Sequence, residues 1–372
     1  MAQAIDSGKV VHGGAFFEAI GTDFRTLERS ADVVNADVLD AWFDPSPRVL
    51  AALRAHLPFA LRTSPPSESA GLVREIALRR RLDPASILTA GGSSDLMYHA
   101  LVPLIEPGSD VLLLDPTYGE YAHICSLAGA RVIRHSLESR REFRIHSAAL
   151  SEHIRAARPS LVLLVNPNSP TGRHLSRIEL SEIIDEAPAG TDFLIDETYV
   201  DYCGSGESLE RDISSRKNLF VLKSMSKVYA LSGARAAYLA GPPARIADLA
   251  RYIPPWSVSL PAQIAAVEAL RDPDYYAARY AETHRLRTAC VARARTFARS
   301  RVLDTSLPFY LIELDSSLSA EELTMRLREQ DLFVRNCSSF SKIFGDAWLR
   351  ISVRSATENE RLLDALDRRL GG

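Results

Sequence analysis

The chain has 372 residues, of which 46% are apolar and 24% are charged. This usage is ordinary for globular proteins, so the composition excludes a disordered or low-complexity chain, and the length suits two or three domains. Lysine and arginine number 44 against 47 for aspartate and glutamate, which gives a net charge of −3 and disfavours nucleic-acid binding.

Neither a membrane helix nor a secretion signal is expected. No apolar run is long enough to span a bilayer, and the first residues lack the apolar core of a signal peptide. We therefore expect a cytoplasmic protein without membrane contact. The four cysteines are scattered without the spacing of a zinc site or redox motif, so we expect reduced structural thiols and no metal site. They are Cys125, Cys203, Cys290 and Cys337.

Short apolar runs alternate with amphipathic stretches through the first two thirds of the chain. Runs bounded by turn residues predict strands at 111–115, 130–135, 161–166, 193–197, 219–224 and 236–241. Apolar residues at three and four spacing predict crossover helices at 94–105 and 177–187. This alternation predicts an α/β fold with a mostly parallel sheet between helices.

The pattern changes from about residue 273. A long charged helix is followed by the apolar runs FYLIEL, DLFVRN and WLRISV, with helices between and after them. This order predicts a smaller α+β domain. We expect a large domain over residues 46–270 and a small one over 271–372, with residues 1–45 as an arm against the small domain.

A lysine follows the predicted strand at 219–224. Lys227 comes after Ser224 and Ser226, and Arg235 follows it. Ligands of open parallel sheets bind beyond the carboxyl ends of the strands, so this lysine is a candidate nucleophile beside an anion site. Taken alone, the segment also fits a solvated lysine.

A carboxylate lies at the end of the predicted strand at 193–197. Asp196 is followed by Tyr199. A carboxylate beside a pyridine nitrogen keeps that nitrogen protonated, which pyridoxal phosphate needs in order to act as an electron sink. The alternative is a helix cap and a packed aromatic ring.

Three other segments could complete such a site. Gly91 and Gly92 precede Ser93 and Ser94 at the start of a predicted helix, whose free N–H groups could cradle a phosphate. Tyr118 follows a strand and could stack on a flat cofactor, and the turn-rich exit 166–172 follows another. Each could also be an ordinary loop.

Together and in this order, these segments resemble the fold-type I pyridoxal-phosphate enzymes of the class I/II aminotransferase superfamily, over nearly the whole chain. The resemblance implies that Lys227 forms the Schiff base with the cofactor and that Asp196 pairs with the pyridine nitrogen. It further implies that Tyr199 binds the phenolic oxygen and that Tyr118 stacks on the ring. The residues implied to hold the phosphate are Ser93, Ser94, Ser224, Ser226 and Arg235.

Within the superfamily the chain is similar to the histidinol-phosphate aminotransferase branch, and to its threonine-phosphate decarboxylase side. The segments that carry this likeness are His12-Gly13-Gly14, PPWSVS at 254–259, and LFVRNCSSF followed by WLRISVRSATENERLL. The resemblance implies that Arg350 clamps the substrate α-carboxylate, while Arg335 and the loop with Gly14 face the distal end. Alternatively, Arg335 pairs with an acidic side chain; Arg354 is a candidate surface residue.

Two departures from the branch bear on the site. Ser169 stands where the family has an asparagine before Pro-Thr-Gly, so we assign the contact with the phenolic oxygen to Asn166, with Asn168 and Ser169 as alternatives. The loop DVLDAWFDPSP has Trp42 and Asp44 where relatives carry an asparagine-rich segment. The natural substrate could therefore differ from those of both relatives.

We expect a homodimeric aminotransferase for an α-amino acid with a polar or anionic distal group, with Lys227, Asp196 and Tyr118 as catalytic residues. The alternative is decarboxylation of a phosphorylated amino acid, or another biosynthetic reaction such as elimination, cyclisation or oxidation. A protein that binds cofactor without turnover is the hypothesis from a different class.

Overall fold

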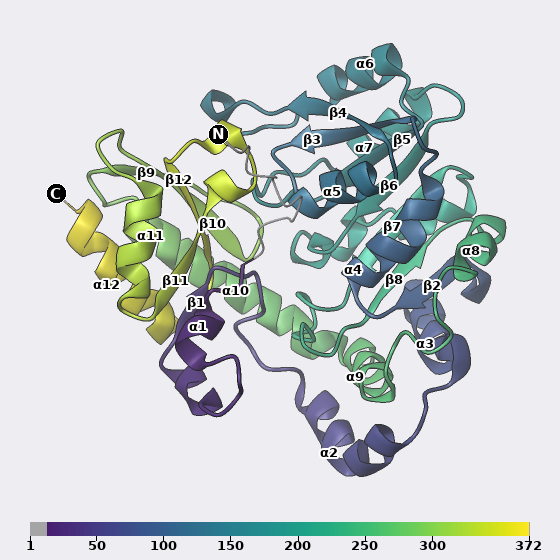
Figure 1. Ribbon diagram of the computed structural model, residues 1–372, viewed down its shortest axis with the longest axis horizontal. Helices are drawn as coiled ribbons and strands as arrows, with labels where there is room; N and C mark the ends of the chain where they lie inside the picture. The colour runs from purple at the N-terminus through teal and green to yellow at the C-terminus, as the bar shows by residue number, and fades with distance from the viewer. Residues whose placement is uncertain (1–12, 372) are drawn as a thin grey trace, which may run out of the picture.

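The structure is a computed structural model that describes residues 13–371 (Figure 1). The helices are α1 (Phe16–Ile20), α2 (Pro47–Arg62), α3 (Ala70–Arg80), α4 (Ser93–Leu96), α5 (Gly119–Leu127), α6 (Ser147–Ala157), α7 (Arg177–Glu186), α8 (Pro243–Ala250), α9 (Leu260–Leu270), α10 (Pro273–Ala294), α11 (Ala320–Arg328) and α12 (Ala356–Leu370). The strands are β1 (Val34–Ala36), β2 (Ile87–Ala90), β3 (Asp110–Asp115), β4 (Arg131–Ser136), β5 (Leu161–Val165), β6 (Asp192–Asp196), β7 (Leu219–Ser224), β8 (Ala237–Ala240), β9 (Ser300–Leu303), β10 (Phe309–Leu314), β11 (Leu332–Asn336) and β12 (Trp348–Ser352).

The larger sheet confirms the predicted α/β class. Its order is β2-β8-β7-β6-β5-β3-β4, and the five strands from β7 to β4 are parallel. All six predicted strands are present, with ends shifted by at most one residue. Strand β2 was not predicted; it is a four-residue run that pairs antiparallel with β8 at the edge.

Both faces of this sheet are covered because its strands alternate apolar side chains across it. In β3, Val111 and Leu113 pack with residues of α4, α5 and α8, whereas Leu112 and Leu114 pack with residues of α6 and α7. This is the two-sided burial expected of parallel strands.

The smaller sheet forms a second lobe (Figure 1) with the order β1-β11-β12-β10-β9. β1 pairs in parallel with β11; this three-residue strand was too short to show in the sequence pattern. Helix α10 reaches both lobes: Tyr276 near its start packs in the cluster beside the large sheet, and Cys290 and Val291 near its end pack on the small one. No helix within residues 13–371 is long and apolar enough to cross a membrane.

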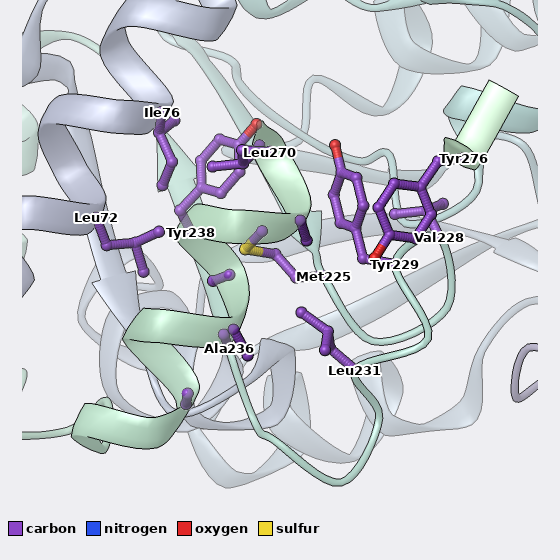
Figure 2. Packing of buried hydrophobic residues seen from close by; sticks show 14 of the residues in the cluster. Leu72, Ile76, Met225, Val228, Tyr229, Leu231, Ala236, Tyr238, Leu270 and Tyr276 are labelled. Carbon is purple, nitrogen blue, oxygen red and sulfur yellow. The ribbon is translucent and has the colours of Figure 1, made fainter. Parts of the chain in front are cut away.

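A packed apolar cluster anchors the loop that carries Lys227. Figure 2 shows Met225, Val228, Leu231 and Ala236 among the side chains that gather near α3 and α9. All four are buried. Buried residues stand on both sides of Lys227 and fix the loop by packing. Lys227 itself is not part of this cluster.

A cluster of charged side chains lies behind the ends of β6 and β7. Lys223 Nζ lies 3.3 Å from a carboxylate oxygen of Glu197, 3.5 Å from Asp201 and 3.7 Å from Glu210. Arg80 lies 3.5 Å from Asp201 and 3.8 Å from Glu210. Three carboxyl groups therefore share two cations. Burial raises the pKa of Glu197 to about 7, against the opposing charge of Lys223.

We predict that this carboxyl makes the protein less stable as the pH rises. Between an unfolded pKa of about 4.5 and a folded pKa of about 7, the folded chain keeps a proton that the unfolded chain has lost, so the free energy of unfolding falls through this window. Glu197→Gln should remove that part of the slope. Thermal unfolding of both proteins at several pH values measures it, and parallel pH profiles would contradict the prediction.

Candidate functional site

A cavity of about 230 Å³ opens where the parallel strands of the large sheet end. It collects most of the residues that the sequence analysis singled out. Those that line it are Ser93, Ser94, Tyr118, Asp196, Tyr199, Ser224, Ser226, Lys227, Arg235, Arg335 and Arg350. Strand ends far apart in sequence meet here because parallel strands present their carboxyl ends at one edge of the sheet.

Asp196 is the buried acid of the cavity. One of its oxygens accepts a 2.6 Å hydrogen bond from the hydroxyl of Tyr121, and the other accepts bonds from the amide and hydroxyl of Thr198 at 2.9 and 2.6 Å. Burial raises the pKa of Asp196, although these hydrogen bonds oppose the rise. Tyr121 and Thr198 were not predicted as site residues. A threonine two residues after an aspartate is a turn signal that indicates the contact of Thr198.

The opposite end of the cavity is built for an anion. Gly92 has φ +99° between β2 and α4, and a Cβ placed there would lie 2.5 Å from a guanidinium nitrogen of Arg235. That guanidinium donates to the carbonyl of Ser232 at 2.8 Å and lies 3.5 Å from the Ser226 hydroxyl. The start of α4, with Ser93 and Ser94, lies beside it, so a fixed cation and free N–H groups face the same space.

Tyr118 and Tyr199 form an aromatic wall of the cavity. Tyr118 caps the start of α5 and meets Tyr121 edge to face, with ring centroids 6.0 Å apart. Burial raises the pKa of Tyr118 to about 12 and also raises that of Tyr199. Both phenols are therefore neutral at physiological pH and can donate hydrogen bonds.

Lys227 lies in the same cavity and forms an ion pair. Its Nζ is 2.6 Å from Oδ1 of Asp40. Asp40 belongs to the loop in which the sequence analysis singled out Trp42 and Asp44, but the pattern gave no reason to select Asp40 itself.

Asn166 does not line the cavity. Its amide accepts from the N–H of Leu175 at 2.8 Å and donates to the carbonyl of the same residue at 2.9 Å, so it holds the turn together and does not line the cavity. Asn168 is also fully buried, with its amide bonded to Thr117, Pro116 and Thr171. Ser169 is the residue of this turn that faces the cavity.

The N-terminal glycines lie at the rim. Gly13 lines the cavity, whereas the amide of Gly14 donates to Oδ2 of Asp37 at 2.9 Å. Gly14 therefore positions an acidic side chain of the wall instead of facing the cavity itself. His12 lies outside the described residues.

Two buried arginines stand side by side in the wall. Arg335 and Arg350 are register partners in the β11–β12 pair, and the guanidinium groups lie 4.9 and 5.0 Å from the ring centre of Phe340. Arg335 is 3.5 Å from a carboxylate oxygen of Asp37. It therefore pairs with an acidic side chain, which was the alternative expected from the sequence. Like charges directly opposite in a sheet repel each other, so the pair favours a bound anion.

Arg350 is the less compensated of the two. It donates to the Ser169 hydroxyl at 3.1 Å and to the carbonyl of Asp37 at 2.8 Å, and its Nε is buried without a hydrogen-bond partner. Within residues 13–371 no carboxylate lies at ion-pair distance from it. Burial lowers the pKa of Arg350. Arg354 was a candidate surface residue, but its side chain is only 12% exposed.

These features fit pyridoxal 5′-phosphate. The cavity holds an anion site at Gly92 and Arg235, a buried carboxylate at Asp196, an aromatic wall and a lysine. Because Gly92 has no Cβ, the guanidinium of Arg235 can lie against its backbone. Within residues 13–371, no three His, Cys, Asp or Glu side chains are grouped so that they could hold a metal ion, and the four cysteines are free thiols.

Comparisons with known proteins give one family. Residues 35–366 match the model of aminotransferase class I and II. The chain is 31% identical over 340 residues to histidinol-phosphate aminotransferase 2 of Gluconobacter oxydans. The aligned region covers 90% of this chain and 91% of that protein.

Solved structures have the same fold. Histidinol-phosphate aminotransferase from Sinorhizobium meliloti, in complex with pyridoxal-5′-phosphate, has a TM-score of 0.84 at 20% identity and covers 98% of this chain and 96% of its own. L-threonine-O-3-phosphate decarboxylase from Porphyromonas gingivalis has a TM-score of 0.76 at 23% identity, covering 88% and 99%.

Gly92→Ala should weaken the binding of pyridoxal 5′-phosphate to cofactor-free protein by about tenfold or more, because the new Cβ must displace Arg235 and the residue must hold a positive φ. Fluorescence titration with the cofactor measures the dissociation constant. Gly71→Ala, where a Cβ meets open space, is the matched control. An unchanged dissociation constant for the Gly92 variant would show that Arg235 is not needed at this position.

Proposed function

Because the chain belongs to the class I and II aminotransferase family and is a pyridoxal-phosphate-dependent enzyme, we propose that it transfers the amino group of an α-amino acid whose distal end is polar or anionic. The observation that carries the choice of substrate is the pair of buried arginines, Arg335 and Arg350, facing each other across β11 and β12. Asp37 pairs with Arg335, so the α-carboxylate of a substrate would compensate Arg350, and a polar or anionic distal group would lie near Arg335.

The proposed roles follow from position in the cavity. Lys227 would hold the cofactor through Nζ, and the free amine would take up the proton of the substrate α-carbon at that atom. Asp196 holds the pyridine nitrogen in its protonated form, and Tyr199 donates to the phenolic oxygen. When bound, pyridoxal 5′-phosphate supplies an electron sink for the α-carbon.

The remaining residues bind and orient. Tyr118 provides the flat surface against the ring, and Arg235 anchors the phosphate with the hydroxyl and amide groups around it; these are Ser93, Ser94, Ser224 and Ser226. Arg350 would bind the α-carboxylate and so orient the bonds of the substrate α-carbon. Ser169 is the residue we now assign near the phenolic oxygen in place of Asn166.

Decarboxylation of a phosphorylated amino acid is the second candidate. It is favoured by the end of β11 and the segment that follows, where Arg335, Ser339 and Phe340 line the cavity. The two reactions need the same residues and differ in which α-carbon bond is aligned with the ring.

We also propose a homodimer in the cytoplasm, with the large and small domains divided near residue 270. Large apolar side chains are exposed on α2 at Phe59 and Leu61 and after α8 at Tyr252 and Trp256, as at association surfaces. Light scattering of the purified protein tests the dimer.

The test of the reaction is mass spectrometry of products from the cofactor-loaded protein. Single amino acids and phosphorylated amino acids are supplied first without and then with a keto acid acceptor. Turnover to a keto acid that requires the acceptor is expected. A product that has lost carbon dioxide in the absence of an acceptor would instead support the decarboxylase, and Lys227→Ala should abolish either reaction while the protein stays folded.

Arg350→Ala should weaken substrate binding by about ten- to a hundredfold, because a charge-assisted contact is worth roughly 1.5 to 3 kcal/mol. The spectral change on substrate addition measures the dissociation constant. Arg326→Ala is the control, since it removes an arginine that pairs with Glu322 at the surface of α11 and does not line the cavity. Unchanged affinity in the Arg350 variant would assign the carboxylate to Arg335 or Arg354.

A further inference from the structure

The ion pair of Lys227 is made with a residue from a distant part of the chain. Asp40 lies in the loop between β1 and α2, and its Oδ1 is 2.6 Å from Nζ of Lys227. The two side chains are 32% and 20% exposed. Among residues 13–371, Asp40 is the one carboxylate at ion-pair distance from Lys227, although Asp196 and Asp37 line the same cavity.

The loop that carries Asp40 is held by side chains that alternate along β12 and just beyond it. Arg350 donates to the carbonyl of Asp37 at 2.8 Å, Ser352 to that of Val38 at 3.0 Å, and Arg354 to that of Asp40 at 3.0 Å. Residues two apart on a strand point to one side, so the three donors address successive parts of the loop. The backbone of Asp40 is thereby fixed to the small sheet.

The next turn of the loop is fixed as well. The indole N–H of Trp42 donates to the hydroxyl of Thr283 in α10 at 2.8 Å, and the backbone N–H of Ser46 donates to the hydroxyl of Tyr276 at 3.2 Å. Because the loop is bonded on both sides of Asp40, the carboxylate has little freedom to leave Lys227.

The surroundings keep Asp40 charged. Burial would raise the pKa of Asp40, but the charge and hydrogen bond of Lys227, a hydrogen bond from Ser232 and the charge of Arg354 together hold it below its ordinary value. The other charged groups that line this cavity are Asp37, Asp196, Arg235, Arg335 and Arg350. At neutral pH the partner of Lys227 is therefore a carboxylate anion.

We propose that Asp40 is a positioning residue for Lys227: its carboxylate orients Nζ and stabilises positive charge on that nitrogen, and Arg354 keeps the carboxylate in place. This inference rests on the proposed role of Lys227 as the residue that carries the cofactor. It gives a function to a loop that the sequence analysis could describe only as a departure from the relatives.

The consequence concerns the linkage that Lys227 would form with the bound cofactor, because the carboxylate of Asp40 lies 2.6 Å from Nζ. A neighbouring opposite charge favours the charged form of a nitrogen base. In cofactor-loaded protein, the nitrogen of the Lys227–cofactor linkage should therefore keep its proton to a higher pH when Asp40 is present. The visible absorbance band of the linkage reports its protonation without any turnover.

The experiment is a spectral pH titration of the cofactor-loaded wild type and of Asp40→Asn. We expect the midpoint of the absorbance change to fall by about one pH unit or more in the variant, the size of effect typical of a close opposite charge. Asp40→Glu should restore part of the shift and keeps the test open if Asp40→Asn does not fold. Asp44→Asn removes the same charge from an exposed position of the loop and should leave the midpoint unchanged.

The outcomes separate this inference from the proposed function. If borohydride reduction of the loaded wild type leaves no cofactor on Lys227, the role of Lys227 itself is wrong. If the cofactor is fixed there but Asp40→Asn titrates like the wild type, or Asp44→Asn shifts equally, the role of Asp40 is overturned.

Discussion

The edge at which β3, β5, β6 and β7 end together is the constraint on which the cavity depends. Parallel strands place their carboxyl ends on one side of a sheet, and these strands lead into Tyr118, Ser169, Asp196 and Lys227. Buried side chains on both sides of Lys227 fix its loop to the core. The chemical groups are thus held by elements that hydrophobic burial keeps rigid.

Charge pairing inside the cavity is specific. Asp37 faces Arg335, and Asp40 faces Lys227, while the oxygens of Asp196 accept from Tyr121 and Thr198. Arg350 has hydrogen-bond acceptors but no carboxylate partner among the described residues. A buried charge without a partner is costly, so an anion that binds beside Arg350 would stabilise the site.

The small sheet acts on the cavity through β12. Arg350 and Ser352 of β12, and Arg354 two residues beyond it, fix the loop at Asp37, Val38 and Asp40, and Arg350 itself lines the cavity. One strand therefore supplies a proposed substrate contact and also holds the loop that meets Lys227. A rearrangement between the two lobes would move both together, which couples the geometry of substrate and lysine.

The sequence by itself determined the six principal strands, the ends of those strands as the site, and the grouping of Lys227, Asp196, Arg235 and Arg350. It could do so because apolar runs and the residues that follow them are local signals. The structure does not bring Asn166 into the cavity, because its amide closes a local turn with Leu175. Only the tertiary structure decided that Tyr121 meets Asp196, that Arg354 holds the Asp40 backbone and that Asp40 meets Lys227, because these contacts join segments whose separation along the chain carries no periodic signal.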